Sequence, residues 1–163
     1  PYLTKEFPYL KIDPAKLQEK GISFELAATS GGYLMYGERV DFEDVEPRDF
    51  CVVGSFGVSR TGGRTGKGAG FADLETGIFR ELGIIGPDTP MATTIHSSQL
   101  VGDDEIFMMA HDSPLDFVAT EEELIVTNNS MPRPKGVAWE FVQDDQFETI
   151  PFLKSLRDRM ESR

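Results

Sequence analysis

The sequence predicts an α/β fold with three layers and a largely parallel sheet. The short apolar run at residues 50–53 is typical of a strand buried on both faces. A glycine-rich stretch follows it, apolar residues then recur at helical spacing over residues 71–82, and a second apolar run occupies residues 91–95. A strand, a loop, a helix and another strand in this order form a βαβ unit, in which the two strands lie parallel.

The N-terminal part of the chain has little hydrophobic periodicity. A short helix is predicted over residues 15–20, because Asp13 can cap its start, Pro14 suits its first position and Gly21 can end it. Residues 33–40 follow two glycines and predict an edge hairpin.

The helix of the βαβ unit is predicted to end at Gly83, since glycine commonly terminates helices. Its apolar residues are Phe71, Leu74, Ile78, Phe79 and Leu82. Further strands are predicted over residues 115–119 and 124–127, and a charged surface helix over residues 154–162. The chain has no internal repeat and no low-complexity linker, so we expect a single domain over residues 1–163.

Composition excludes several classes of protein. The chain has 28 acidic and 16 basic residues and a formal net charge of −12, which disfavours binding to nucleic acid or to an anionic membrane. No apolar stretch approaches the roughly 18 residues of a membrane span, and no signal peptide is visible. The single cysteine, Cys51, cannot form an internal disulfide. These features predict a cytoplasmic protein.

The most informative segment is residues 54–70, which contains seven glycines, three cations and no acid. Glycines allow a backbone to approach a ligand closely and to turn its N–H groups toward it. The three cations are Arg60, Arg64 and Lys67. A basic glycine loop in an acidic protein predicts an anion site, with phosphate as the natural ligand.

Two standard phosphate loops do not match this segment. A P-loop needs Ser or Thr after its Gly-Lys pair, and here Gly68 follows Gly66 and Lys67. A dinucleotide fingerprint needs G-x-G-x-x-G, whereas the spacing from Gly66 to Gly70 gives G-x-G-x-G. The remaining pattern is a strand, a long basic glycine loop and a helix whose N-terminus faces the anion.

Two acids near the start of that helix, Asp73 and Glu75, suit the helix dipole or could hold a metal that bridges phosphates. The alternative interpretation is a set of turn glycines, surface cations and capping acids. The reversed local charge and the position between strand and helix favour a functional site.

Residues 64–73, RTGKGAGFAD, resemble the 5-formyltetrahydrofolate cyclo-ligase family. That family carries an R-x-G-x-G-x-G-[FY]-x-D loop that binds ATP phosphates. The resemblance covers residues 49–139 well and residues 1–40 only loosely. Other matching features occur in similar order, namely residues 53–59, residues 94–96 with Gln99, His111 and Asp112 with Asp116, and residues 133–136 with Trp139.

The resemblance implies a ligase that depends on ATP and Mg²⁺. ATP would phosphorylate the formyl oxygen of 5-formyltetrahydrofolate, a reduced folate, and the neighbouring folate nitrogen would close the ring with loss of phosphate. The implied residues are Gly66, Gly68, Gly70 and Phe71 for the cofactor, Arg64 and Lys67 for catalysis, and Asp73 for the metal.

Three features depart from the family pattern. The segment G-K-G-x-G-F-A-D-L-E at residues 66–75 is more similar to a divergent branch of the family. Ala69 stands where typical enzymes have Lys, and Lys67 lies two residues earlier. Family members are also longer at the N-terminus, whereas this chain begins at Pro1. We therefore expect an upstream segment or a second associated chain to complete the site, and an oligomer is compatible with this.

Three functional hypotheses remain open from the sequence. The first is a cyclo-ligase-like enzyme. The second is a non-catalytic or regulatory domain that binds nucleotide or another phosphorylated ligand. The third is an enzyme that retains the loop for a different acyl or phosphate substrate.

The only two histidines, His96 and His111, have no metal-binding spacing around them. Structural hydrogen bonding at strand ends is the leading interpretation for both, and lining of the active site is the second. Phe107, Met108 and Met109 are expected in a packed or interface patch, with a pterin pocket as the alternative.

Overall fold

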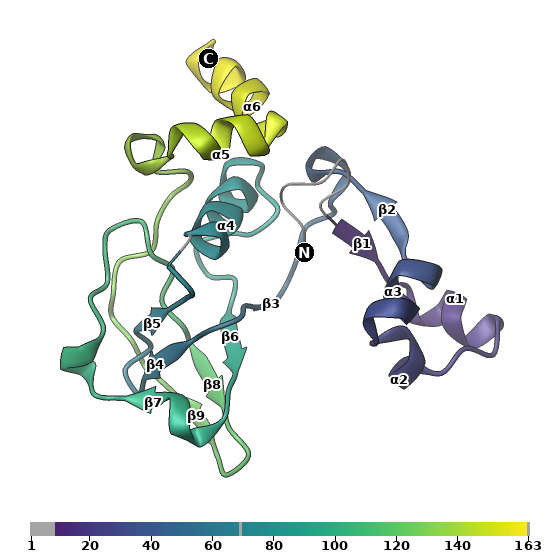
Figure 1. The fold of residues 1–163 in the computed structure, drawn as a ribbon, viewed down its shortest axis with the longest axis horizontal. Helices are drawn as coiled ribbons and strands as arrows, with labels where there is room; N and C mark the ends of the chain where they lie inside the picture. Colours follow the sequence, from purple (N-terminus) through teal and green to yellow (C-terminus); the bar gives the residue numbers. More distant parts are fainter. Residues whose placement is uncertain (1–8, 69, 163) are drawn as a thin grey trace. The chain divides into compact units, whose positions relative to one another are not determined.

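The structure is a computed structural model that describes residues 9–68 and 70–162 (Figure 1). These residues form two compact units. One unit contains the described residues up to Val45 together with those from Gln143 onward, and the other is Glu46–Val142. The single domain over residues 1–163 stays a prediction, because compact units can belong to one domain or to two.

The unit Glu46–Val142 contains two sheets. The four-stranded sheet has the order β3-β6-β8-β9, in which β3, β6 and β8 are parallel and β9 is antiparallel to β8. The three-stranded sheet has the order β5-β4-β7, with β4 antiparallel to β5 and parallel to β7. The strands are β3 (Cys51–Val52), β4 (Gly57–Ser59), β5 (Arg64–Thr65), β6 (Met91–Thr94), β7 (Leu100–Val101), β8 (Phe117–Ala119) and β9 (Leu124–Val126). Parallel strands joined through a helix confirm the α/β class.

Helix α4 (Phe71–Glu81) connects the glycine loop to β6 and confirms the predicted helix. Ile78 is fully buried on its inner face, and Gly77 lets the backbone of Gly136 approach closely, because a Cβ at Gly77 would lie 3.1 Å from that carbonyl oxygen. Gly83 follows the helix with φ 71° and ends it as predicted.

One face of the four-stranded sheet packs with Val58 of β4 to form the hydrophobic core. The buried residues Val58, Met91, Leu115, Val118 and Ile125 pack together there. The prediction that the strand over residues 50–53 is buried on both faces is wrong for the opposite face of the sheet. Val52 is 64% exposed, because β3 is an edge strand whose alternate side chains point away from the core.

The other unit contains short helices and a two-stranded antiparallel sheet of β1 (Tyr9–Lys11) and β2 (Glu38–Val40). Phe42 stacks on Phe152, with ring centroids 4.6 Å apart, and so joins the two chain segments of the unit. The helices are α1 (Pro14–Glu19), α2 (Phe24–Ala27), α3 (Ser30–Tyr36), α5 (Asp144–Thr149) and α6 (Pro151–Glu161). Helices α1 and α6 confirm the predictions at both chain ends.

The hairpin predicted over residues 33–40 is wrong. Residues 33–36 belong to α3, whose start is capped by Thr29, since its Oγ1 accepts the N–H of Gly32 at 3.0 Å. Only β2 is extended, and its partner is β1 rather than an adjacent strand. Four short 3₁₀ turns complete the described elements, at Phe42–Asp44, Ser97–Gln99, Asp103–Glu105 and Trp139–Phe141.

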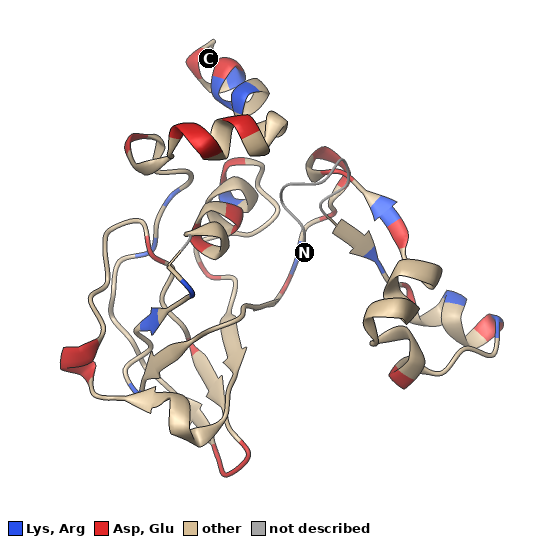
Figure 2. Cartoon of the chain, in the orientation of Figure 1, with Lys and Arg blue, Asp and Glu red and all other residues tan. Residues whose placement is uncertain are grey.

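The acidic runs lie at exposed turns (Figure 2). Residues 103–105 and 121–123 are exposed, and acidic residues also occur along α5. Glu123 forms an ion pair with Arg60, which lies in the turn between β4 and β5. None of the helices in the described residues combines the length and hydropathy that a membrane-spanning helix needs.

Candidate functional site

The glycine loop joins β5 to the N-terminus of α4. Gly68 has φ 93° and Gly70 has φ 66°, both in the left-handed region that favours glycine. A Cβ at either position would meet no atom within 4 Å, so these glycines are required by backbone conformation and not by crowding. The space beside the loop is therefore open to a ligand.

The start of α4 adds unpaired backbone donors to this loop. Gly70 is the N-cap residue, and the N–H of Leu74 donates to its carbonyl oxygen at 3.0 Å. The amides of Phe71, Ala72 and Asp73 precede that first intrahelical bond and have no acceptor within the helix. These amides and the helix dipole favour an anion at this end.

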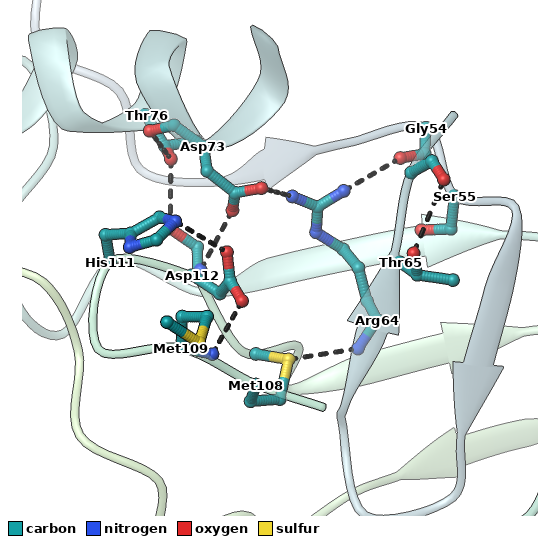
Figure 3. Close-up of polar contacts among 12 residues, drawn as sticks. Gly54, Ser55, Arg64, Thr65, Asp73, Thr76, Met108, Met109, His111 and Asp112 are labelled. Carbon is teal, nitrogen blue, oxygen red and sulfur yellow. Dashed lines mark hydrogen bonds and ion pairs between the residues drawn. The ribbon is translucent and has the colours of Figure 1, made fainter. Parts of the chain in front are cut away.

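The side chain of Arg64 is only 2% exposed and extends toward Asp73 and Gly54 (Figure 3). Its Nη2 donates to Asp73 Oδ2 at 2.5 Å, and its Nη1 donates to the carbonyl oxygen of Gly54 at 3.3 Å. Its backbone N–H donates to the sulfur of Met108 at 3.4 Å. The guanidinium thus connects the chain after β3 to the first turn of α4.

Asp73 uses both carboxylate oxygens. Oδ2 binds Arg64, and Oδ1 accepts the backbone N–H of Ser113 at 3.0 Å. The hydroxyl of Ser113 lies 2.9 Å from Thr76 Oγ1 and accepts a hydrogen bond from Arg80 Nη1 at 2.9 Å. Asp73, Thr76 and Arg80 are spaced by one and two helical turns, so one face of α4 holds Ser113 in place.

Burial lowers the pKa of Arg80. Desolvation lowers the pKa of its guanidinium, and the nearby positive charge of Arg133 lowers it further. The Nε atoms of Arg64 and Arg80 are buried and have no hydrogen-bond partner within the described residues. Both arginines therefore depend on the few contacts that their remaining nitrogens make.

Lys67 differs from Arg64 although both precede the same glycines. Its side chain is exposed, and within the described part of the chain it forms no ion pair. Phe71, at the start of α4, is 37% exposed beside the loop. The predicted site residues thus lie together, while Ala69 lies outside the described residues.

The chain matches the 5-formyltetrahydrofolate cyclo-ligase family over residues 6–121. It belongs to this family. The curated relatives include the methenyltetrahydrofolate synthase domain-containing proteins of Homo sapiens (36% identical over 149 residues), Bos taurus (35% over 151 residues) and Danio rerio (33% over 147 residues). These matches cover 91%, 93% and 90% of the chain and 39%, 40% and 38% of the relatives, respectively. The chain therefore spans about two-fifths of the length of these relatives, and the family resemblance inferred from the sequence is confirmed.

The cyclo-ligase family pattern does not include several residues that support the site. Ser113 and Met108 approach the glycine loop from a segment about 40 residues away in sequence. Thr76 and Arg80 could have been found from the sequence, because they continue the helical face of Asp73. No pattern in the sequence connects Ser113 with that face.

Asp73 is the carboxylate to which the family resemblance assigns magnesium. Both oxygens of Asp73 already accept strong donors, one of them a guanidinium. No group of three or more His, Cys, Asp or Glu side chains in the described residues is placed to hold a metal ion. This donor set does not fit a resident ion, and the assignment of Asp73 to magnesium stays a prediction.

The two histidines lie in different settings. His96 is exposed after β6, where its Nδ1 lies 2.9 Å from Ser98 Oγ and accepts the N–H of Ser98, in agreement with the expected hydrogen bonding at a strand end. The ring of His111 packs against Phe141, with centroids 4.5 Å apart, and its Nε2 lies 3.6 Å from Asp112 Oδ1. His111 therefore lies in the polar cluster near Asp73 (Figure 3).

A second polar cluster lies where β6 and β8 begin. Asp116 accepts the N–H of Met91 at 2.8 Å and forms an ion pair with Arg133, which also donates to the carbonyl oxygen of Thr89 at 3.3 Å. Asn129 donates to the carbonyl oxygen of Leu115 at 2.8 Å beside it. These contacts join the sheet to the following chain and assign Asp116 and Arg133 a structural role.

Proposed function

We propose that this chain binds ATP, supplied as its magnesium complex, and uses it to convert 5-formyltetrahydrofolate to 5,10-methenyltetrahydrofolate. The proposal rests on membership of the cyclo-ligase family together with one structural observation. The segment RTGKGAGFAD forms an open glycine loop that leads directly into the N-terminus of α4.

Phosphate groups of ATP bind at this loop. Backbone N–H groups of Gly66, Gly68 and Gly70 face the phosphates, and the first amides of α4, beginning at Phe71, continue the cradle. An anion at a helix N-terminus gains about 0.3–1 kcal/mol from the dipole at an exposed position. Lys67 adds a mobile positive charge at the same place.

Phosphoryl transfer requires the protein to position the reactants and to neutralise the phosphate charge, and it depends less on covalent catalysis. ATP supplies a γ-phosphoryl group, which passes to the formyl oxygen while ADP leaves. The neighbouring folate nitrogen then attacks the activated carbon and releases its N–H proton to solvent or phosphate, the ring closes, and inorganic phosphate leaves with the former formyl oxygen. Lys67 and the loop amides neutralise the phosphoryl oxygens during the first step, whereas the resemblance assigns this neutralisation to Arg64.

A second candidate function is a non-catalytic or repurposed domain that binds nucleotide or phosphate with the same loop. The burial of Arg64 favours it, because a cation already paired with Asp73 is less available to a transferring phosphoryl group. A reduced-folate substrate belongs to the first candidate only. The cytoplasmic setting and the lack of a nucleic-acid partner stay predictions from composition.

The deciding experiment mixes the chain with magnesium-ATP and 5-formyltetrahydrofolate and follows the near-ultraviolet absorbance of the methenyl product. Lys67→Ala removes the exposed loop cation, and Lys154→Ala is the matched control, because Lys154 is an exposed lysine on α6. The proposal expects a product band that Lys67→Ala weakens and Lys154→Ala leaves unchanged.

The other outcomes are equally informative. Without product, a rise in melting temperature with ATP would establish the second candidate, because a ligand that binds the folded state stabilises it. If there is no product and no shift in melting temperature, both candidates are overturned.

A further inference from the structure

We infer that Arg64 and Asp73 act in this chain as a buried clamp that positions the glycine loop, and that Lys67 alone supplies the loop's net positive charge to a phosphate ligand. The inference rests on the proposed phosphate site. It differs from the roles that the family pattern implies, in which Arg64 neutralises phosphate and Asp73 holds magnesium.

The first argument is the balance of charge. Residues 54–70 contain three cations, but folding brings acids from other segments to two of them. Arg60 pairs with Glu123, and Arg64 pairs with Asp73. Within the described residues, Lys67 is the cation of this segment that has no acidic partner.

The second argument is the position of the ion pair. Arg64 stands where the loop begins, and Asp73 stands three residues after its last glycine. Their contact at 2.5 Å therefore fixes the separation of the two loop ends. The contacts of Arg64 with Gly54 and Met108 hold it from two other segments, so the clamp is anchored outside the loop.

The third argument concerns the metal. Mg²⁺ needs oxygen ligands at about 2.0–2.1 Å in near-octahedral geometry. A cation on Asp73 Oδ2 would lie against the guanidinium of Arg64, and two cations at such a separation repel each other. Oδ1 is directed to the N–H of Ser113. An ion that drew the carboxylate of Asp73 away from Arg64 would leave the buried guanidinium without its counter-charge.

The fourth argument is the layer behind the clamp. Ser113 donates its N–H to Asp73, and its hydroxyl is held by Thr76 and Arg80. This layer fixes the carboxylate in the orientation that meets Arg64.

The test variant is Asp73→Asn. The control variant is Asp88→Asn, because it removes the same charge from an exposed loop. Calorimetry measures the dissociation constant of ATP with and without Mg²⁺, and thermal unfolding is followed in parallel. The clamp predicts that Asp73→Asn lowers the melting temperature by roughly 10 °C. It also predicts that the ratio of the two dissociation constants stays within about twofold of wild type. Loss of the magnesium effect at an unchanged melting temperature would overturn the inference.

A double-mutant cycle tests the ion pair without any nucleotide. If Arg64 and Asp73 form a clamp, Arg64→Met combined with Asp73→Asn destabilises less than the sum of the single changes. Additive effects would contradict the inference. The cycle tests the ion pair even if wild type binds no ATP, a result that would refute the proposed function and the role of Lys67 but not the clamp.

Lys67→Ala serves if the clamp variants fail to fold, because Lys67 is exposed and its removal leaves the packing intact. We expect it to weaken ATP binding at least about tenfold, as for loss of a charge-assisted hydrogen bond. Unchanged ATP affinity in Lys67→Ala would overturn the inference.

Discussion

Replacement of Gly70 by alanine tests the phosphate site most directly. Gly70 has φ 66°, and its added Cβ would meet no atom within 4 Å, so the change causes strain without a clash. An alanine in this left-handed conformation costs about 1–2 kcal/mol. For a chain of this size, such a loss lowers the melting temperature by roughly 2–8 °C.

Binding of ATP should fall more steeply than stability. The new methyl group stands in the open space beside the amides of Gly70 and Phe71, where we place the phosphates. Loss of one hydrogen bond to a charged group costs about 1.5–3 kcal/mol, which raises the dissociation constant roughly 10- to 100-fold. Isothermal calorimetry with magnesium-ATP measures this change.

Two glycines provide matched controls. Gly21 has φ 65° and Gly83 has φ 71°, and a Cβ at either would also meet no atom within 4 Å. Gly21→Ala and Gly83→Ala therefore impose similar strain away from the loop. If these variants weaken ATP binding as much as Gly70→Ala does, or if Gly70→Ala leaves it unchanged, the phosphate site is wrongly placed.

Four further predictions follow from the same structure. Ile78→Ala removes a fully buried side chain of α4 and should destabilise by about 2–5 kcal/mol in denaturant unfolding; a loss below about 1 kcal/mol would contradict the packing. Asp116→Ala should destabilise by about 3 kcal/mol, because it leaves Arg133 unpaired, and calorimetry should find ATP affinity unchanged. Arg60→Ala should also leave ATP affinity unchanged in that assay, because Arg60 already pairs with an acid. Burial raises the pKa of the Cys51 thiol, so alkylation of the folded protein at pH 8 should be slower than alkylation of the protein unfolded in urea. The free energy of unfolding should also fall as the pH rises past the thiol's ordinary pKa, because the unfolded chain loses that proton at a lower pH than the folded chain does.

The helix after the loop was predictable because several independent signals agree there. Its apolar residues recur at helical spacing, and Gly83 marks its end. The strands inside the glycine segment were not predictable in this way. β4 and β5 contain five residues in total. They are stabilised because β4 pairs with β5 on one side and with β7 on the other. Such pairing depends on residues distant in sequence, so a local pattern does not reveal it.

The hairpin predicted over residues 33–40 failed for a different reason. Two glycines suggested a turn, but a threonine hydroxyl placed before them caps a helix that contains both. Side-chain capping of this kind stabilises a short helix by about 1 kcal/mol. The helix contains two glycines, which cost about 1 kcal/mol each in helix propensity, so the cap alone does not offset them. Packing must add to it, as at the buried Gly32.

The candidate site shows where a sequence misleads about charge. Arg64 and Lys67 are equivalent in the linear pattern, since both are cations beside the same glycines. In the structure, Arg64 is buried against Asp73, whereas Lys67 is exposed without an acidic partner in the described chain. The electrostatic attraction that a ligand experiences depends on unpaired charge, because a close ion pair has only the weak field of a dipole. The reversed charge of the loop is therefore smaller than the sequence suggests and is concentrated at Lys67, and the ion pair of Arg64 with Asp73 joins the two ends of the loop.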